Sequence, residues 1–154
     1  MGGGLTHRLA KDDAMMIKEN DLASMHEELD THAERLVTYL QGVDMTSVGA
    51  FLEIETRTDK EALMAAMVWS QRRANEGLDR LVIMLDNFTP EACKIVSEQM
   101  EDQGVREHVV LEASGGIVFK DLKSWHECGL DVVSTSVINR GVAPLDVSML
   151  VKGL

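Results

Sequence analysis

The sequence is short of several features that mark whole classes of protein. It has only two cysteines, Cys93 and Cys128, without the spacing of a metal or redox motif, which indicates reduced thiols in a cytosolic protein. Basic residues are scarce, 15 against 26 acidic ones, and the net charge of −11 argues against broad binding to nucleic acids or anionic membranes. No apolar run approaches the roughly 18 residues of a membrane-spanning helix. The first residues lack the pattern of a secretory signal.

What the chain does have is an ordinary globular composition. It has 154 residues, of which 45% are hydrophobic and 27% are charged, and this composition excludes disordered, collagen-like and low-complexity proteins. The length matches one domain. Because no internal repeat or linker divides the sequence, residues 1–154 are expected to form a single unit.

Two hydrophobic periods alternate along the chain and predict its fold class. Thr89 and either Thr58 or Asp59 are expected N-caps, and three glycines are expected helix stops. Mostly apolar strands between helices predict an α/β fold, a parallel sheet of about five strands covered by helices. The predicted strands lie at residues 14–17, 48–54, 81–85, 108–111 and 132–135, the helices at 21–41, 59–75, 89–103 and 120–127, and the helix stops at Gly77, Gly104 and Gly129.

The chain is too short for a closed barrel of this kind. An eight-stranded (β/α) barrel takes about 250 residues, and this sequence supplies about five of the eight units. Either the sheet is open, or the chain is a portion of a larger fold. Because a partial barrel exposes a sheet edge, we expect it to be unstable or prone to aggregation alone unless it dimerises or pairs with a further segment.

Polar residues gather where the strands are expected to end. Lys18 follows the first run, Asp86 the third and Glu112 the fourth, while Glu53 and Glu55 alternate on one face of the second. The carboxyl ends of parallel strands form the functional site in α/β folds. The sequence therefore predicts a site at this edge of the sheet.

Glu55 and Asp86 form the candidate acidic pair at this edge. Their carboxylate oxygens can coordinate Mg²⁺, which prefers hard oxygen ligands, or accept hydrogen bonds from sugar hydroxyls. The alternative is that each acid caps the helix that follows its strand, and for Asp86, three residues before Thr89, that alternative has weight.

The candidate anion-binding groups are glycine-rich or basic. In Ser114-Gly115-Gly116 the backbone N–H groups can turn toward a phosphate, assisted by a helix that starts after them, although a simple turn is the alternative. Lys18 either binds an anion or extends to solvent. His7-Arg8 either forms an anion clamp or belongs to a flexible terminal tail.

Six blocks of sequence carry a family resemblance. They are GGG at 2–4 with HR at 7–8, MIKEN at 16–20, EIETRT at 53–58, IMLDN at 83–87, LEASGG at 111–116, and more weakly GLDVVST at 129–135 with LDVS at 145–148. In this order they resemble the carboxyl-terminal barrel portion of quinolinate phosphoribosyltransferase, also called nicotinate-nucleotide pyrophosphorylase (carboxylating). Any single block is modestly specific, but the ordered set is strong and spans nearly the whole chain.

The resemblance implies a cytoplasmic pentosyltransferase of NAD biosynthesis, a homodimer or higher homo-oligomer. It would join quinolinate to phosphoribosyl pyrophosphate with Mg²⁺ and release CO₂, pyrophosphate and nicotinate mononucleotide. By this resemblance Lys18, Glu55 and Asp86 are catalytic, and Glu55 and Asp86 face the metal and the ribose hydroxyls. His7, Arg8 and Lys18 hold the quinolinate carboxylates, and the phosphate is cradled by Ser114, Gly115, Gly116, Ser136 and Arg140.

The sequence also departs from the family pattern. The family's Thr-His near the last phosphate loop is Asn139-Arg140 here, its glycine is Ser136, and the histidine after the asparagine of its lysine block is Asp21. These changes keep open a related phosphoribosyltransferase for another pyridine acid, such as nicotinate. The family's amino-terminal domain and first barrel strands, with further Arg and Lys residues, have no counterpart here. A third reading is therefore a non-catalytic barrel half that binds a phosphosugar.

Overall fold

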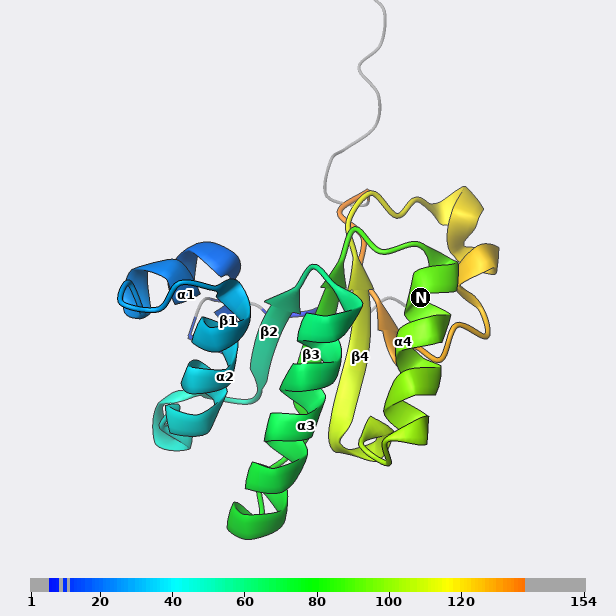
Figure 1. The fold of residues 1–154 in the computed structure, drawn as a ribbon. Helices are drawn as coiled ribbons and strands as arrows, with labels where there is room; N and C mark the ends of the chain where they lie inside the picture. Colours follow the sequence, from blue (N-terminus) through cyan, green and yellow to red (C-terminus); the bar gives the residue numbers. More distant parts are fainter. Residues whose placement is uncertain (1–5, 9, 11, 138–154) are drawn as a thin grey trace, which may run out of the picture.

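A five-stranded parallel sheet forms the centre of the molecule (Figure 1) in the computed structural model, which describes residues 6–8, 10 and 12–137. Each strand pairs in parallel with the next strand along the chain. The predicted α/β fold with five parallel strands is thus confirmed. The strands are β1 (Met15–Ile17), β2 (Leu52–Thr56), β3 (Leu81–Asp86), β4 (Val109–Ser114) and β5 (Val132–Val133).

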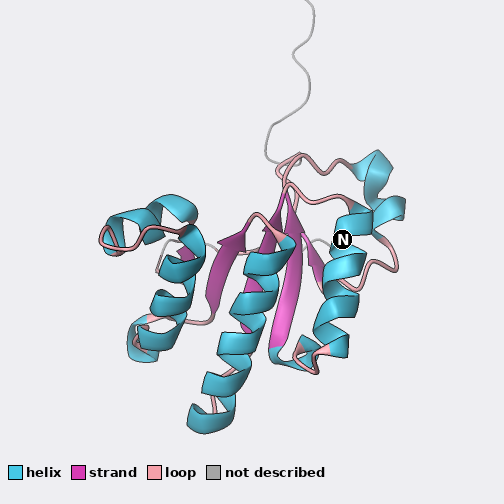
Figure 2. Cartoon of the chain, viewed as in Figure 1, coloured by secondary structure: helices cyan, strands magenta, loops and turns pink. Residues whose placement is uncertain are grey.

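Helices cover one face of this sheet (Figure 2), with α2, α3 and α4 packed side by side in front of the strands. None of the helices in the described part of the chain is long and apolar enough to cross a membrane. The helices are α1 (Glu19–Met25), α2 (His32–Gly42), α3 (Asp59–Glu76) and α4 (Pro90–Asp102), with short 3-10 helices η1 (Met45–Ser47), η2 (Arg106–His108) and η3 (Phe119–Trp125).

The two longest helices begin where the sequence places their caps. The side-chain oxygens of Thr58 and Thr89 each accept a hydrogen bond from the backbone N–H three residues later. Each bond satisfies one of the N–H groups that the first helical turn leaves without a partner. Thr58, rather than Asp59, is the N-cap of α3, and Pro90 opens α4.

The single helix predicted over residues 21–41 is wrong, because the structure has α1 and α2 with a turn between them. Thr31 caps α2 and exchanges hydrogen bonds with Glu34, the reciprocal capping box. The guanidinium group of Arg35 donates to two backbone carbonyls of the turn. These bonds stabilise the break in place of the hydrogen bonds of a continuous helix.

Other boundaries also differ from the prediction. The strand predicted from residue 48 begins at Leu52, because η1 and a turn occupy the residues before it. The helix predicted over residues 120–127 is the 3-10 helix η3. Gly129 ends no helix in the described chain; it packs against Ser97, and a Cβ placed on it would lie 2.5 Å from the Ser97 Cβ.

Side chains alternate between the two faces of the sheet and fix its register. On β2, Leu52 and Ile54 are buried in the core beneath the helices, so Glu53 and Glu55 point to the other face. Strand β4 alternates in the same way and directs Glu112 to that face. Burying one such Leu or Ile contributes about 1.5–3 kcal/mol, whereas a slip by one residue would place carboxylates in the core. The acids are therefore held on the helix-free face.

Candidate functional site

The predicted strand-end residues meet at one edge of the sheet, as parallel strands require. Lys18 comes directly after β1, Glu55 lies near the end of β2, and Asp86 ends β3. The ammonium group of Lys18 donates to Glu55 Oε2 and forms an ion pair with it. The Glu55 side chain is 11% exposed and that of Lys18 is 51% exposed, so the lysine is the member of the pair that can turn toward a ligand.

The next two strands bring Asp86 and the Ser-Gly-Gly loop together. Asp86 is the register partner of Ser114 across β3 and β4, and Asn87 N–H donates to the Ser114 carbonyl at 2.8 Å. The Asn87 amide also donates to Asp86 Oδ2 at 2.6 Å. Gly115 has a φ of +101°, and a Cβ placed on it would lie 2.9 Å from the backbone nitrogen of Asn87. This close approach requires glycine.

The loop that is predicted to bind phosphate differs in one respect from the prediction. No α-helix starts directly after Gly116; two residues separate it from η3, a 3-10 helix of seven residues. The helix predicted after these glycines is thus a short 3-10 helix that begins after two intervening residues. The loops after β4 and β5 do meet, because Thr135 Oγ1 donates to the Ile117 carbonyl at 2.5 Å. Ser136 follows Thr135 directly, so the structure places it beside this loop, while Arg140 lies outside the described residues.

His7 and Arg8 lie against the helix-free face. The His7 ring makes an edge contact with Phe51, with ring centroids 5.6 Å apart. The Arg8 guanidinium donates to the Ala14 carbonyl at 3.1 Å and to the sulfur of Met16 at 3.8 Å. Both residues thus contact the sheet, and Arg8 bonds residues that precede Lys18 in the chain. These contacts differ from the flexible terminal tail that was the alternative for His7 and Arg8.

Two buried carboxylates, Glu53 and Glu112, lie beneath His7; the sequence placed both near the strand ends but gave neither a role in the site. Glu53 is 0% and Glu112 is 2% exposed. The Nε2 atom of His7 lies 2.8 Å from Glu53 Oε2 and 3.5 Å from Glu112 Oε2. The alternation of Glu53 with Glu55 was the available signal for one of them. Glu112 was expected to follow β4, but the strand continues to Ser114 and carries Glu112 inside it.

The pKa of one member of this buried pair, Glu53, lies well above the ordinary value of a glutamate. Burial, with the charge of Glu112 as a second cause, raises the pKa of Glu53 to about 8. The charges of Arg8 and Lys18 oppose the rise without cancelling it. At neutral pH the Glu53 carboxyl therefore keeps a proton much more readily than an ordinary glutamate does, unless a cation comes to lie beside it.

Glu55 and Asp86 fit the chemistry of the Mg²⁺ ion that the family resemblance implies. Mg²⁺ takes oxygen ligands, is bound by one or two carboxylates and keeps several waters. The two residues offer carboxylate oxygens at the ends of adjacent strands. The Glu55 carboxylate already binds one cationic group, the ammonium of Lys18.

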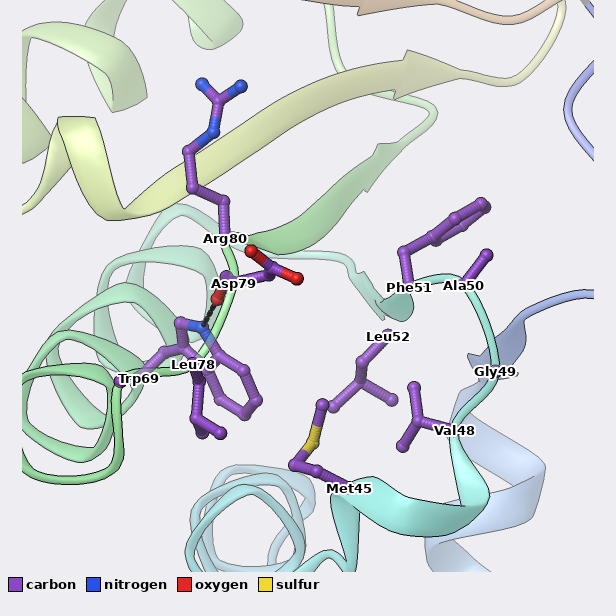
Figure 3. Close-up of a pocket in the computed structure, with 11 residues that line it drawn as sticks. Met45, Val48, Gly49, Ala50, Phe51, Leu52, Trp69, Leu78, Asp79 and Arg80 are labelled. Carbon is purple, nitrogen blue, oxygen red and sulfur yellow. Dashed lines mark hydrogen bonds between the residues drawn. The ribbon is translucent and has the colours of Figure 1, made fainter.

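Two pockets lie at opposite ends of the sheet. A groove between the starts of α3 and α4 adjoins Asp86 and is lined by Thr58, Phe88 and Thr89, among others. The other pocket (Figure 3) lies where β2 and β3 begin, and the Trp69 indole at its wall donates to the Asp79 carbonyl at 2.9 Å. Only the first borders the strand-end residues, so the second is not the candidate site.

Comparisons with known proteins show which family the chain resembles. Residues 1–150 match the family described as quinolinate phosphoribosyl transferase, C-terminal domain. The chain is 33% identical over 154 residues to a probable nicotinate-nucleotide pyrophosphorylase [carboxylating] of Methanothermobacter thermautotrophicus, covering all of this chain and 49% of that protein. It is 31% identical over 152 residues to a protein of the same name from Archaeoglobus fulgidus, covering 98% of this chain and 51% of that one.

A solved structure shows the same similarity in three dimensions. The nicotinate-nucleotide pyrophosphorylase from Francisella tularensis superposes with a TM-score of 0.63 at 27% sequence identity, covering 92% of this chain and 42% of that one. The chain thus spans about half the length of the curated relatives that it matches, and the similarity extends along nearly all of it.

Proposed function

The chain belongs to the family of quinolinate phosphoribosyl transferase C-terminal domains, and from this premise we propose that it forms the strand-end site of a quinolinate phosphoribosyltransferase. In the proposed reaction, quinolinate and phosphoribosyl pyrophosphate give nicotinate mononucleotide, pyrophosphate and CO₂. The shared name of the relatives supports this reaction. The observation that carries the proposal is the Lys18–Glu55 ion pair, which sets a cation and a carboxylate together at the edge of the sheet that also carries Asp86.

In this proposal Glu55 and Asp86 act on the ribose. Departure of pyrophosphate leaves positive charge on the sugar ring, and fixed carboxylates nearby stabilise that charge. Glu55 and Asp86 would also hold Mg²⁺, which when bound neutralises the charge of the pyrophosphate leaving group. Their carboxylate oxygens and their position on adjacent strands support both roles.

Lys18, His7 and Arg8 would hold the two carboxylates of quinolinate and fix the orientation of its ring. The chain carries a net charge of −11, so an anionic substrate needs a local group of cations to overcome general repulsion. The exposure of Lys18 supports its role, because it can exchange the carboxylate of Glu55 for that of a substrate.

The phosphate would bind at the loops that follow β4 and β5. Ser114, Gly115 and Gly116 supply small side chains and turned backbone N–H groups, and positive φ angles at both glycines support this role. Ser136 stands beside these residues, next to Thr135. Arg140 remains a proposed phosphate ligand on the basis of the sequence alone.

Several wider features belong to the same proposal. The strand order β1-β2-β3-β4-β5, all parallel and covered by helices on one face, supports a sheet that forms part of a (β/α) barrel. Residues 1–154 would then act as one unit within that barrel. We further propose a homodimer or higher homo-oligomer that acts in the cytoplasm.

A second candidate is a related enzyme that uses a pyridine acid with one carboxylate, such as nicotinate. One contact favours it: the Asp21 carboxylate accepts a hydrogen bond from the Lys18 backbone N–H at 2.8 Å. This contact caps α1, but it also places a negative charge close to Lys18. Such a charge weakens the binding of a dianion more than that of a monoanion.

The test is release of pyrophosphate from phosphoribosyl pyrophosphate with Mg²⁺. The chain is assayed alone and together with the part of the Methanothermobacter relative that it does not cover, with quinolinate or nicotinate as acceptor. Release that depends on quinolinate, in either format, supports the proposal. Release with nicotinate alone selects the second candidate, and binding of phosphoribosyl pyrophosphate without turnover in any format overturns both.

A further inference from the structure

The cluster of His7, Glu53 and Glu112 contains two carboxylates to which the proposed phosphoribosyl transfer assigns no role, beside a histidine that is proposed to bind quinolinate. One ligand atom from each residue, an imidazole nitrogen and two carboxylate oxygens, lies within 4.8 Å of the other two. The two glutamates come from β2 and β4, and His7 approaches from the amino-terminal segment. Three elements far apart in the sequence therefore direct metal-binding atoms to one point on the helix-free face.

Three of the four carboxylate oxygens at this point lack a hydrogen-bond partner among the described residues. In the described chain, these oxygens are Oε1 and Oε2 of Glu53 and Oε1 of Glu112. The 2.8 Å contact from His7 to Glu53 Oε2 is close, but it does not have hydrogen-bond geometry. Burying two carboxylates costs several kcal/mol per charge unless a cation or donors compensate. A cation bound at this point would compensate that cost in place of a proton on one of the carboxylates.

The nearby basic side chains are directed elsewhere. Arg8 donates to the Ala14 carbonyl and the Met16 sulfur, and Lys18 is paired with Glu55. Within the described chain, neither of these residues forms an ion pair with Glu53 or Glu112. Of the basic side chains that the structure describes, His7 alone contacts the pair, and its side chain is 30% exposed. Solvent can therefore reach the cluster from the side of His7.

We propose that His7, Glu53 and Glu112 form a binding site for a divalent transition-metal ion such as Zn²⁺ or Mn²⁺. Two ligands of one such ion lie at most about 4.4 Å apart, because the bonds are roughly 2.0–2.2 Å long. The observed spacing therefore needs only a small contraction. One imidazole with two carboxylates is a donor set for Zn²⁺ or Mn²⁺, whereas Mg²⁺ prefers oxygen alone.

This site is separate from the carboxylates proposed for Mg²⁺. Glu55 points to the same face as Glu53 but forms an ion pair with Lys18. The Asp86 carboxylate accepts a hydrogen bond from the Asn87 side-chain amide. Three protein ligands leave a further coordination position open toward the exposed side of His7, as in metal sites that also bind water or a substrate. The ion would hold the amino-terminal segment against the sheet.

The test is metal binding by the full chain after treatment with a chelator. Zn²⁺ and Mn²⁺ are titrated by calorimetry, and the shift in unfolding temperature is followed in parallel. We expect one ion per chain, and at least a tenfold loss of affinity in His7→Ala and in Glu112→Gln. Glu112→Gln removes an unpaired buried charge, so in chelator it should unfold at the same denaturant concentration as the parent or a higher one. This measurement separates loss of a ligand from loss of the fold.

Two sets of control variants make the result specific. His126 and Glu127 form an exposed pair 3.7 Å apart, and His126→Ala should leave the affinity unchanged. Glu55→Gln with Asp86→Asn should also leave it unchanged. The proposal is overturned by the absence of binding, by loss of binding only in His126→Ala, or by loss only in the Glu55 and Asp86 variants. The readout is independent of catalysis, so this site and the proposed function can fail separately.

Discussion

Lys18 donates its ammonium group to the carboxylate of Glu55, a residue 37 positions later in the chain. The pair exists because β1 and β2 run in parallel, with Ile17 and Ile54 as register partners, so that the residue after each partner reaches the same edge. The exposed lysine and the largely buried acid form a contact that a ligand can open.

Removing the carboxylates at the strand ends should strongly slow turnover without unfolding the chain. In the combined pyrophosphate-release assay, Glu55→Gln and Asp86→Asn are each expected to lower kcat by about 10²–10³-fold, the usual effect of losing one preorganised electrostatic group. The control is Glu98→Gln, since Glu98 belongs to an exposed pair with Lys94. A rate within about twofold of the parent in both variants would remove the acids from the proposed mechanism.

The close approach of Gly115 to Asn87 should make that glycine irreplaceable. Gly115→Ala is expected to lower the free energy of unfolding by about 3 kcal/mol, because the backbone must shift and the positive φ becomes strained. Gly116 also has a positive φ but has open space around it, so Gly116→Ala should cost only about 1 kcal/mol. Urea unfolding measures both, and equal losses would contradict the close approach.

Asp131 should be needed to hold the edge strand β5 in place. Its Oδ2 accepts a hydrogen bond from the Leu111 N–H and another from Arg106 Nη2, each at 2.8 Å. Losing these charged bonds in Asp131→Ala should cost about 1.5–3 kcal/mol and lower hydrogen-exchange protection in β5. Glu107→Ala, at a side chain that is 82% exposed, should change stability by less than about 0.5 kcal/mol. If β5 keeps its protection in Asp131→Ala, another contact holds the strand.

The buried thiols should be inert in the folded protein. Burial raises the pKa of Cys93 to about 12 and also raises the pKa of Cys128, so the reactive thiolate is scarce at pH 8. Ellman's reagent should modify neither thiol in the native state and both after unfolding. Fast modification of the native chain would contradict this burial.

The raised pKa of Cys93 also has a consequence for stability. Between the ordinary value of 9.0 and about 12, the folded state holds a proton that the unfolded state releases. The free energy of unfolding should therefore fall as the pH rises through this interval. Cys93→Ala should show a smaller fall between pH 8 and pH 10.5 in denaturant titrations, and an identical fall would exclude the thiol as the cause.

Local sequence signals predicted much of the fold. The cap residues Thr58 and Thr89 act through hydrogen bonds to N–H groups three residues away, so their effect is visible in a short window of sequence. The turn between α1 and α2 was missed because its support from Arg35 comes from a helix beyond it. A 3-10 helix at η3 could not be told from an α-helix, since over seven residues the two periods differ little.

The sequence by itself determined the alternation of strands and helices, the edge at which Lys18, Glu55 and Asp86 gather, and the family, because each depends on periodicity or on ordered motifs. Only the tertiary structure decided that Glu53 and Glu112 are buried beneath His7. Side-chain alternation gives the face on which an acid lies, but its exposure depends on what packs over that face. That packing brings together residues from the amino-terminal segment, β2 and β4, which no local pattern connects.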